Sequence, residues 1–330
     1  MATFAKDFLS IDDISPLQIR ALIECARQLK AERLSGYFPE RLKHKSIVLL
    51  FDKSSTRTRC AFEVAAAEEG AHVTVLTNSH FGKKESIADT AQVLSRYYHG
   101  IQHRGNDLDD VYALAKSASV PVWNGLTDQN HPTQAIADVM TISEQVDKPY
   151  QAIKVVFVGD ALCNTATSLM RACSKLGMHF YAYAPTSRHP DVAQQQSLAK
   201  TAQSHGGSIV FTDDKALAMI DADIVYTDVW FSMGEEDEMA ARIKLLQPYQ
   251  VNTALMTATE NPRAKFMHCL PAFHDTQTQI GQTVAQQLGY DSLEVTDAVF
   301  QGPQSIVFDQ AENRLHTIKA IMLATLQITV

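Results

Sequence analysis

The sequence is poor in cysteine, and its cysteines are not spaced for metal binding. Five cysteines occur among 330 residues, and none of them forms a Cys-x-x-Cys pair. This pattern indicates a reducing compartment, with neither a disulfide framework nor a cysteine zinc site. The His-Glu-x-x-His pattern is also missing, so we expect no metal site.

Long hydrophobic runs are absent as well. No apolar stretch approaches the roughly 18 residues of a membrane-spanning helix. Residues 1–14 are polar and end acidic, unlike a signal peptide. The net charge of −8 lacks the basic excess that a nucleic-acid surface requires. We therefore expect a cytoplasmic protein with neither a membrane nor a nucleic-acid partner.

Two nucleotide-binding signatures are missing too. An apolar run ending before Gly159 invites a dinucleotide interpretation, but the Gly-x-Gly-x-x-Gly fingerprint is absent. The polar turn at residues 54–59 lacks the glycines and the lysine of a phosphate loop. A dinucleotide-dependent oxidoreductase is therefore only a remote alternative.

The sequence does contain a regular alternation of strand-like and helix-like segments. Its length and its apolar content of 45% fit two globular domains. Continuous apolar runs are typical of strands in buried parallel sheets, and helical spacing of apolar residues appears between them. We predict an α/β fold with two α/β domains, mainly parallel sheets and interdomain helices. The expected strands are Ser46–Phe51, His72–Leu76, Gly100–Arg104, Val120–Trp123, Ile153–Val158, His179–Tyr183, Ser208–Thr212, Ile224–Tyr226 and Lys265–His268.

The polar stretch Asp147–Gln151 has the composition of a hinge between the two domains. We expect a first domain of residues 1–147 and a second domain of residues 148–312. The last segment, Ser305–Leu326, has the spacing of one long helix. Such a helix is long enough to return to the first domain, so residues from about 313 to 330 are assigned there.

The most informative motif is the polar turn Ser54–Arg59, which follows the expected strand Ser46–Phe51 and opens a helix. Unpaired backbone N–H groups and the helix dipole favour an anion at a helix start. A helix cap with an exposed arginine is the plainer interpretation. Two guanidinium groups and four hydroxyl groups within six residues favour an anion site instead.

Further polar residues follow other expected strands. Arg104 ends a strand, where it is either a salt-bridged surface residue or a ligand for a carbonyl or phosphate group. His131 precedes Pro132 at a helix start and lies three residues before Gln134, so both side chains fit one face of the turn. A capping histidine with a structural glutamine is the alternative.

The second half of the chain offers three comparable positions. Asn164 is expected either to bind the polar end of a ligand or to cap a helix. Asp228 follows a buried strand and suits an ammonium group, although a turn residue is the plainer interpretation. Cys269 is placed like an inert buried cysteine unless basic neighbours lower its pKa. Parallel strands share one carboxyl edge, so we expect the motifs to converge on one cleft, with Arg314 added if the last helix crosses the domains.

Together these segments resemble the aspartate/ornithine carbamoyltransferase family over nearly the whole chain. The runs at residues 55–59, 131–134 and 268–271 read Ser-Thr-Arg-Thr-Arg, His-Pro-Thr-Gln and His-Cys-Leu-Pro, in the family's order and spacing. The ornithine branch of the family is indicated by Asp228 with the later run 232–234, and by Phe308–Arg314.

The resemblance implies transfer of the carbamoyl group of carbamoyl phosphate to the δ-amine of L-ornithine, which gives L-citrulline and phosphate in arginine metabolism. It assigns carbamoyl phosphate to the first domain and ornithine to the second. The family uses no cofactor and no metal, and its members form trimers or assemblies of trimers, so a homotrimer is expected. The implied ligands of carbamoyl phosphate are Ser55, Thr56, Arg57, Thr58, His80, Arg104, His131, Gln134, Cys269, Leu270 and Arg314. The implied ligands of ornithine are Asn164, Asp228, Ser232 and Met233. The implied catalytic residues are Arg104, His131, Asp228, Cys269 and Arg314.

Two segments depart from the family pattern. His80 stands where the family has a glutamine that reaches a neighbouring subunit's phosphate site, and the charge of an imidazole varies with pH. Leu162 and Cys163 replace the arginine and the first asparagine of an Arg-Asn-Asn run. These differences bear on substrate affinity and inhibitor sensitivity rather than on the type of reaction.

Two alternatives stay open within this resemblance. The first is a carbamoyltransferase for another amine, such as putrescine. The second is a catalytically silent paralogue that binds anions, which the His80 segment motivates and the intact arginines Arg57 and Arg104 oppose.

Overall fold

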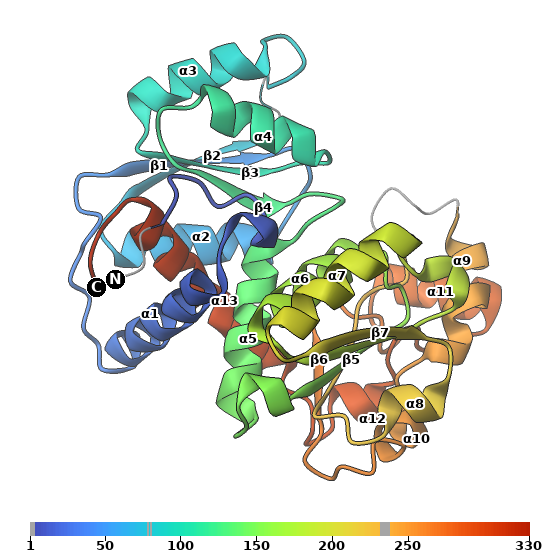
Figure 1. Ribbon diagram of the computed structural model, residues 1–330. Helices are drawn as coiled ribbons and strands as arrows, with labels where there is room; N and C mark the ends of the chain where they lie inside the picture. Colours follow the sequence, from blue (N-terminus) through green and yellow to red (C-terminus); the bar gives the residue numbers. More distant parts are fainter. Residues whose placement is uncertain (1–3, 78, 80, 232–237) are drawn as a thin grey trace. The chain divides into compact units, whose positions relative to one another are not determined.

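The computed structural model describes residues 4–77, 79, 81–231 and 238–330. The chain divides into two compact units, residues 1–140 with 311–330 and residues 141–310. Each unit contains one sheet in which every neighbouring pair of strands is parallel. The predicted fold class is thus confirmed (Figure 1).

The first unit has a sheet of four strands in the order β2-β1-β3-β4. Two long helices carry the chain across the boundary between the units, α5 after residue 140 and α13 before residue 311. The elements of this unit, including both boundary helices, are η1 (Ile11–Asp13), α1 (Pro16–Leu34), β1 (Ser46–Phe51), α2 (Arg57–Glu68), β2 (His72–Thr77), α3 (Ile87–Tyr97), β3 (Gly100–Arg104), α4 (Leu108–Ser117), β4 (Val122–Leu126), α5 (Pro132–Gln145) and α13 (Val307–Thr325).

Helices cover both faces of the first sheet. Helices α3 and α4 lie on one face, where Leu94 and Leu114 pack against Val48 and Ile101 (Figure 1). Helices α2 and α13 lie on the other face, and the buried Trp123 indole donates a hydrogen bond to Thr325 Oγ1 at 2.8 Å. A strand buried on both faces must be apolar throughout, which explains the continuous apolar run of β1.

The second unit has a sheet of five strands in the order β7-β6-β5-β8-β9. Helices α6 and α7 cover one face, and α8, α10 and α12 lie on the other (Figure 1). The elements are η2 (Tyr150–Ala152), β5 (Lys154–Val158), α6 (Asn164–Leu176), β6 (His179–Tyr183), η3 (Thr186–Arg188), α7 (Val192–Ser204), β7 (Ser208–Thr212), α8 (Lys215–Met219), β8 (Ile224–Thr227), α9 (Met239–Leu246), η5 (Gln247–Tyr249), α10 (Thr253–Thr257), β9 (Lys265–His268), α11 (Gln279–Leu288) and α12 (Asp297–Phe300).

Both sheets reverse their strand order once. In the first sheet the chain moves outward from β1 to β2 and then returns to place β3 on the other side of β1. In the second sheet the same reversal places β8 beside β5. Ligands of open α/β sheets bind outside the carboxyl ends of the two strands at such a switch point. The topology alone therefore predicts a ligand site at the carboxyl edge of each sheet.

The strand β4 begins and ends later than the sequence pattern predicts. The expected strand Val120–Trp123 begins too early, because Pro121 has no N–H to donate to a ladder. The observed strand continues through Asn124, whose side-chain amide donates to Leu9 O at 2.9 Å. Because a buried polar residue interrupts the apolar run, the hydropathy pattern does not predict where this strand ends.

Among the helices in the described ranges, none combines the length and the hydropathy needed to cross a membrane.

Candidate functional site

The polar turn after β1 lies at the switch point of the first sheet. Thr56 occupies the N-cap position of α2, and its side chain makes no capping hydrogen bond. Arg57 is the first residue of the helix, and Ser55 is half-buried beside it. The plainer interpretation of this motif, a side-chain helix cap, therefore does not account for Thr56. Its hydroxyl and the first N–H groups of the helix remain suited to an anion.

Two arginines from distant segments meet at one hydroxyl on α2. Thr58 Oγ1 accepts a hydrogen bond from Arg104 Nη1 at 3.1 Å and another from Arg314 Nη2 at 3.0 Å. Thr58 is fully buried, and Arg314 is only 3% exposed. Arg104 ends β3 and Arg314 lies on α13, so strand, turn and terminal helix of the first unit contribute to one cluster. Such a concentration of buried positive charge suits a bound anion.

His131 lies in the field of the same cations. Burial lowers the pKa of His131 well below its usual value, and Arg314, Arg104 and Arg57 lower it further. The imidazole is therefore neutral near pH 7, with one ring nitrogen able to donate and one able to accept. Three guanidinium groups beside a neutral imidazole form a receptor for an anion with an adjoining polar group. The predicted residues Arg57, Arg104, His131 and Arg314 are brought together in this unit.

Gln134 is buried three residues after His131. Its Nε2 donates to Asp138 Oδ1 at 2.8 Å, and both side chains are at most 1% exposed. A carboxylate can accept hydrogen bonds but cannot donate them, so the amide nitrogen of Gln134, and not its oxygen, must face Asp138. The amide oxygen of Gln134 is consequently directed elsewhere. Asp138 was not among the predicted residues, because an aspartate within a helix gives no local signal of this role.

The predicted residues of the second unit gather at the carboxyl ends of β8 and β9. Cys269 Sγ donates a hydrogen bond to Asp228 Oδ1 at 3.2 Å, and Thr165 Oγ1 lies 3.8 Å from the same sulfur. In this arrangement Cys269 is a thiol whose proton points to a carboxylate. Of the two predicted environments of Cys269, the buried one is wrong, because its side chain is half-buried and hydrogen-bonded to Asp228.

Asn164 does not cap helix α6, contrary to one of its two predicted roles. The cap is Cys163, whose sulfur accepts from Ala166 N at 3.4 Å. Burial raises the pKa of the Cys163 thiol well above its usual value, and the carboxylates of Asp228 and Asp160 raise it further. Cys163 is therefore a protonated thiol with a structural role. Asn164 is the first residue of the helix and is half-buried.

A buried polar network holds the backbone beside Cys269. Leu270 has a φ of 62°, and its N–H donates to His268 Nδ1 at 2.9 Å. Behind it, Glu294 Oε1 accepts from Phe273 N at 2.6 Å and lies 3.3 Å from His268 Nε2. The last approach is a polar contact rather than a well-aligned hydrogen bond. Glu294 was missed by the sequence pattern, although a carboxylate between the apolar residues Leu293 and Val295 was a usable signal.

Three predicted site residues lie outside the described residues, namely His80, Ser232 and Met233.

Two groups in the described part of the chain offer three potential metal ligands within 4.8 Å of one another. They are Asp228 with His268 and Cys269, and His274 with Asp275 and Asp297. In the first group the Cys269–Asp228 hydrogen bond accounts for the proximity. In the second group His274 Nδ1 lies 2.8 Å from Asp297 Oδ1, which is an ordinary hydrogen-bond distance. Neither group therefore requires a metal ion to explain its geometry.

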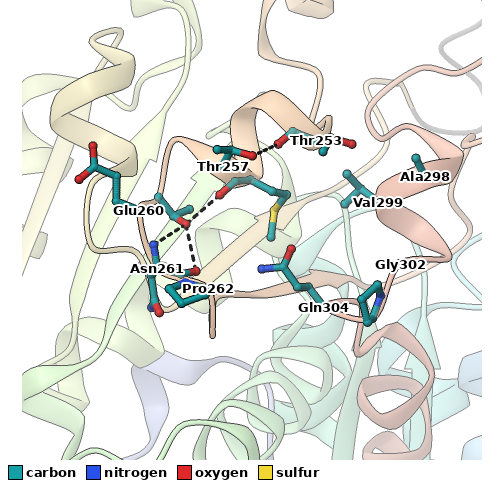
Figure 2. Close-up of a pocket in the computed structure, with 12 residues that line it drawn as sticks. Thr253, Thr257, Glu260, Asn261, Pro262, Ala298, Val299, Gly302 and Gln304 are labelled. Atoms are coloured by element: carbon teal, nitrogen blue, oxygen red, sulfur yellow. Dashed lines mark hydrogen bonds between the residues drawn. The ribbon is translucent and has the colours of Figure 1, made fainter.

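A cleft of about 590 Å³ in the second unit lies elsewhere (Figure 2). It adjoins the amino end of β9, whereas the site residues follow the carboxyl ends of the strands. The hydroxyl groups of Thr257 and Thr259 donate to nearby backbone, as in the 2.9 Å bond from Thr257 Oγ1 to Thr253 O (Figure 2). Glu260 is its one ionisable lining residue in the described ranges. This cleft therefore lacks the cations expected of a site for a phosphorylated substrate. Its lining residues are Thr253, Met256, Thr257, Thr259, Glu260, Asn261, Pro262, Ala298, Val299, Gly302, Pro303 and Gln304.

Comparison with known proteins agrees with the arrangement at the two sheet edges. Residues 6–144 match the family model described as the aspartate/ornithine carbamoyltransferase carbamoyl-P binding domain, and residues 151–325 match the Asp/Orn binding domain of the same family. The chain therefore belongs to the aspartate/ornithine carbamoyltransferase family.

The individual proteins to which the chain is similar are ornithine carbamoyltransferases. The chain is 50% identical over 321 residues to a catabolic ornithine carbamoyltransferase of Clostridium perfringens, covering 97% of each chain. It is 48% identical over 324 residues to an ornithine carbamoyltransferase of Pediococcus pentosaceus, again covering 97% of each. The solved structure of ornithine carbamoyltransferase from Pyrococcus furiosus is 40% identical, matches with a TM-score of 0.90, and covers 100% of both chains.

Proposed function

We propose that this chain is an ornithine carbamoyltransferase, which transfers the carbamoyl group of carbamoyl phosphate to the δ-amine of L-ornithine and releases L-citrulline and phosphate. The observation that carries the proposal is the meeting of Arg104 and Arg314 at Thr58 Oγ1 beside a neutral His131. The family membership supplies the reaction, and the relatives named above supply ornithine as the acceptor. The first unit would bind carbamoyl phosphate and the second would bind ornithine.

The phosphate group is assigned to the turn that opens α2. Ser55, Thr56 and Arg57 would bind its oxygens through hydroxyl groups, a guanidinium group and the first N–H groups of the helix. A dianion at this position gains from the helix dipole as well as from direct contacts. His80 would add a contact from a neighbouring subunit, as the resemblance implies, within a homotrimer or an assembly of trimers.

The carbamoyl group is assigned to the buried cations. When nitrogen attacks the carbamoyl carbon, negative charge grows on its oxygen, and donors already in place stabilise that charge. Arg104, His131 and Thr58 are the proposed donors, with Arg314 completing the cluster. Gln134 would accept from the carbamoyl amide, because Asp138 holds its Nε2 and leaves its oxygen for the substrate.

The amine of ornithine is assigned to the Asp228–Cys269 pair. A free amine has a pKa of about 10.4, so it must be held in its neutral form to attack. The Cys269 proton points to Asp228, which leaves lone pairs on sulfur to accept an N–H of the amine. Leu270 would contribute its backbone beside the reacting atoms. Asn164, Ser232 and Met233 are proposed to bind the rest of ornithine, as the resemblance implies.

The test is a citrulline assay with the purified protein, carbamoyl phosphate and L-ornithine. We expect ornithine-dependent citrulline and an equal amount of phosphate. The same assay with putrescine in place of ornithine distinguishes the acceptor, and we expect at most a small rate. A higher rate with putrescine would reject ornithine as the substrate, and the absence of either product would reject the transfer reaction.

A further inference from the structure

His103 and Asp52 form a partly buried pair at the carboxyl edge of the first sheet. His103 Nε2 lies 3.0 Å from Asp52 Oδ2. The His103 side chain is 1% exposed and the Asp52 side chain 22% exposed. His103 lies on β3 immediately before Arg104, and Asp52 follows β1 two residues before the polar turn. The pair therefore joins the two strands at the switch point.

The histidine ring is fixed by packing on two sides. The ring of Phe81 packs against it with a centroid separation of 4.7 Å and an interplanar angle of 41°. A Cβ atom at Gly105 would overlap the His103 ring and would lie 3.2 Å from Asp52 Oδ2. A side chain at residue 105 would therefore displace the imidazole, so Gly105 leaves the ring the space that it occupies beside its carboxylate partner.

A backbone hydrogen bond also holds Asp52 against the end of β3. Asp52 N donates to Arg104 O at 3.0 Å, which extends the pairing of β1 with β3 by one residue. The next side chain, Lys53, donates to Asp128 Oδ1 at 3.0 Å on the turn after β4. Asp52 is therefore the point from which the polar turn departs. Its side chain is held by His103, and its backbone is held by the strand that carries Arg104.

We propose that His103 and Asp52 are positioning residues for carbamoyl-phosphate binding, which fix the start of the phosphate-binding turn Ser54–Thr58 against β3. This inference rests on the proposed function. Neither residue is a member of the binding motif itself. The pair acts by holding the turn in the conformation that brings its hydroxyl and N–H groups to one anion.

The negative charge of Asp52 is a second reason why its pairing with His103 would favour phosphate binding. The hydrogen bond with His103 lowers the pKa of Asp52, burial opposes this shift, and the charge of Lys83 lowers the pKa further. The carboxylate is consequently ionised at neutral pH, two residues before a turn that binds an anion. An unpaired carboxylate there would be free to rotate toward the phosphate and repel it. Holding its oxygen against His103 prevents that approach.

Substitution of Asp52 distinguishes a positioning role of the pair from a purely electrostatic effect on phosphate binding. In Asp52→Ala a negative charge disappears near an anion site, so electrostatics alone predicts tighter phosphate binding. Positioning predicts weaker binding, because the turn loses its anchor. The loss of a hydrogen bond to a charged group corresponds to about a tenfold change in an equilibrium constant. We expect about a tenfold weaker binding of inorganic phosphate, measured by calorimetry, and an equal rise in KM for carbamoyl phosphate.

Variants of His103 test the other member of the pair. His103→Leu removes the donor while keeping an apolar side chain in a buried place, and we expect the same tenfold effect with KM for ornithine unchanged within about twofold. His103→Gln retains an amide donor and should recover most of the affinity. A double variant with Asp52→Ala should be no weaker than either single variant, because the two residues act as one unit.

A matched control exists at the opposite edge of the same strands. His99 Nδ1 accepts from Ser46 N at 3.1 Å, at the amino ends of β3 and β1. We expect His99→Leu to leave phosphate binding unchanged. Unaltered phosphate affinity in both Asp52→Ala and His103→Leu, or tighter binding in Asp52→Ala, would overturn the inference. Calorimetry with phosphate requires no turnover, so it is informative even if the wild-type protein makes no citrulline, a result that would reject the proposed function separately.

Discussion

The hydroxyl of Thr58 is the most direct test of the proposed carbamoyl site. It accepts hydrogen bonds from Arg104 at 3.1 Å and from Arg314 at 3.0 Å. In Thr58→Val both guanidinium groups lose this acceptor, while the shape of the buried side chain is nearly conserved. Each hydrogen bond that involves a charged group is worth about 1.5–3 kcal/mol, and part of that is recovered when the arginines find substrate or water. We therefore expect a net loss of about 3 kcal/mol in transition-state stabilisation.

That loss corresponds to a fall of about a hundredfold in kcat/KM for carbamoyl phosphate. The assay is the initial rate of citrulline formation at varied carbamoyl phosphate and saturating ornithine. Thr58→Ser retains the oxygen and loses only a methyl group, so it should remain within about fivefold of the wild-type value. Thermal melting of both variants shows whether the fold is intact.

Two results would refute this reasoning. The first is a Thr58→Val protein with kcat/KM close to wild type, which would mean that the two arginines need no common acceptor. The second is a Thr58→Ser protein as impaired as Thr58→Val, which would assign the effect to packing of the methyl group rather than to hydrogen bonding.

Three further predictions concern the two units. Arg57→Ala should raise KM for carbamoyl phosphate at least tenfold and leave the melting temperature nearly unchanged; near-normal Michaelis constants would remove Arg57 from the phosphate site. Cys269→Ala should lower kcat by about a hundredfold with little change in KM for carbamoyl phosphate, and a value of kcat close to that of the wild type would show that the Asp228–Cys269 pair does not orient the amine. Burial lowers the pKa of His316 to about 4, despite the opposing effect of Glu312. The unfolded chain therefore binds a proton that the folded chain does not, and stability falls as pH drops from about 6.5 to about 4. Denaturation of wild type and His316→Gln at pH 7 and pH 5 should show a relative loss of about 2 kcal/mol in the wild type, and an equal pH dependence in both would contradict the lowered pKa.

Local patterns were sufficient to predict most of the fold. Apolar runs such as Ser46–Phe51 and Lys265–His268 match observed strands residue for residue, because burial on both faces requires continuous apolar sequence. Strand boundaries were predicted less accurately where polar residues are buried. At the end of β4, for example, Asn124 donates to a backbone carbonyl far away in the sequence. A hydropathy pattern contains no information about such long-range partners.

Residues of the candidate site could be predicted where they form compact motifs and not where they act through other residues. Arg104 and His131 were predicted from their positions after strands. Asp138 and Glu294 were not, since each contacts the candidate site through one hydrogen bond that only the folded chain creates. Cys163 was an unexpected helix cap, because a thiol is an uncommon acceptor at that position.

The contact between Arg314 and Thr58 joins residues 256 positions apart in the chain. A ribosome synthesises strands β1–β4 long before it adds the arginine that completes their cluster of cations. The full set of charges is therefore complete only after every strand of the other sheet has been translated. A chain that stops before Arg314 would therefore lack one of the two guanidinium groups that meet at Thr58 Oγ1.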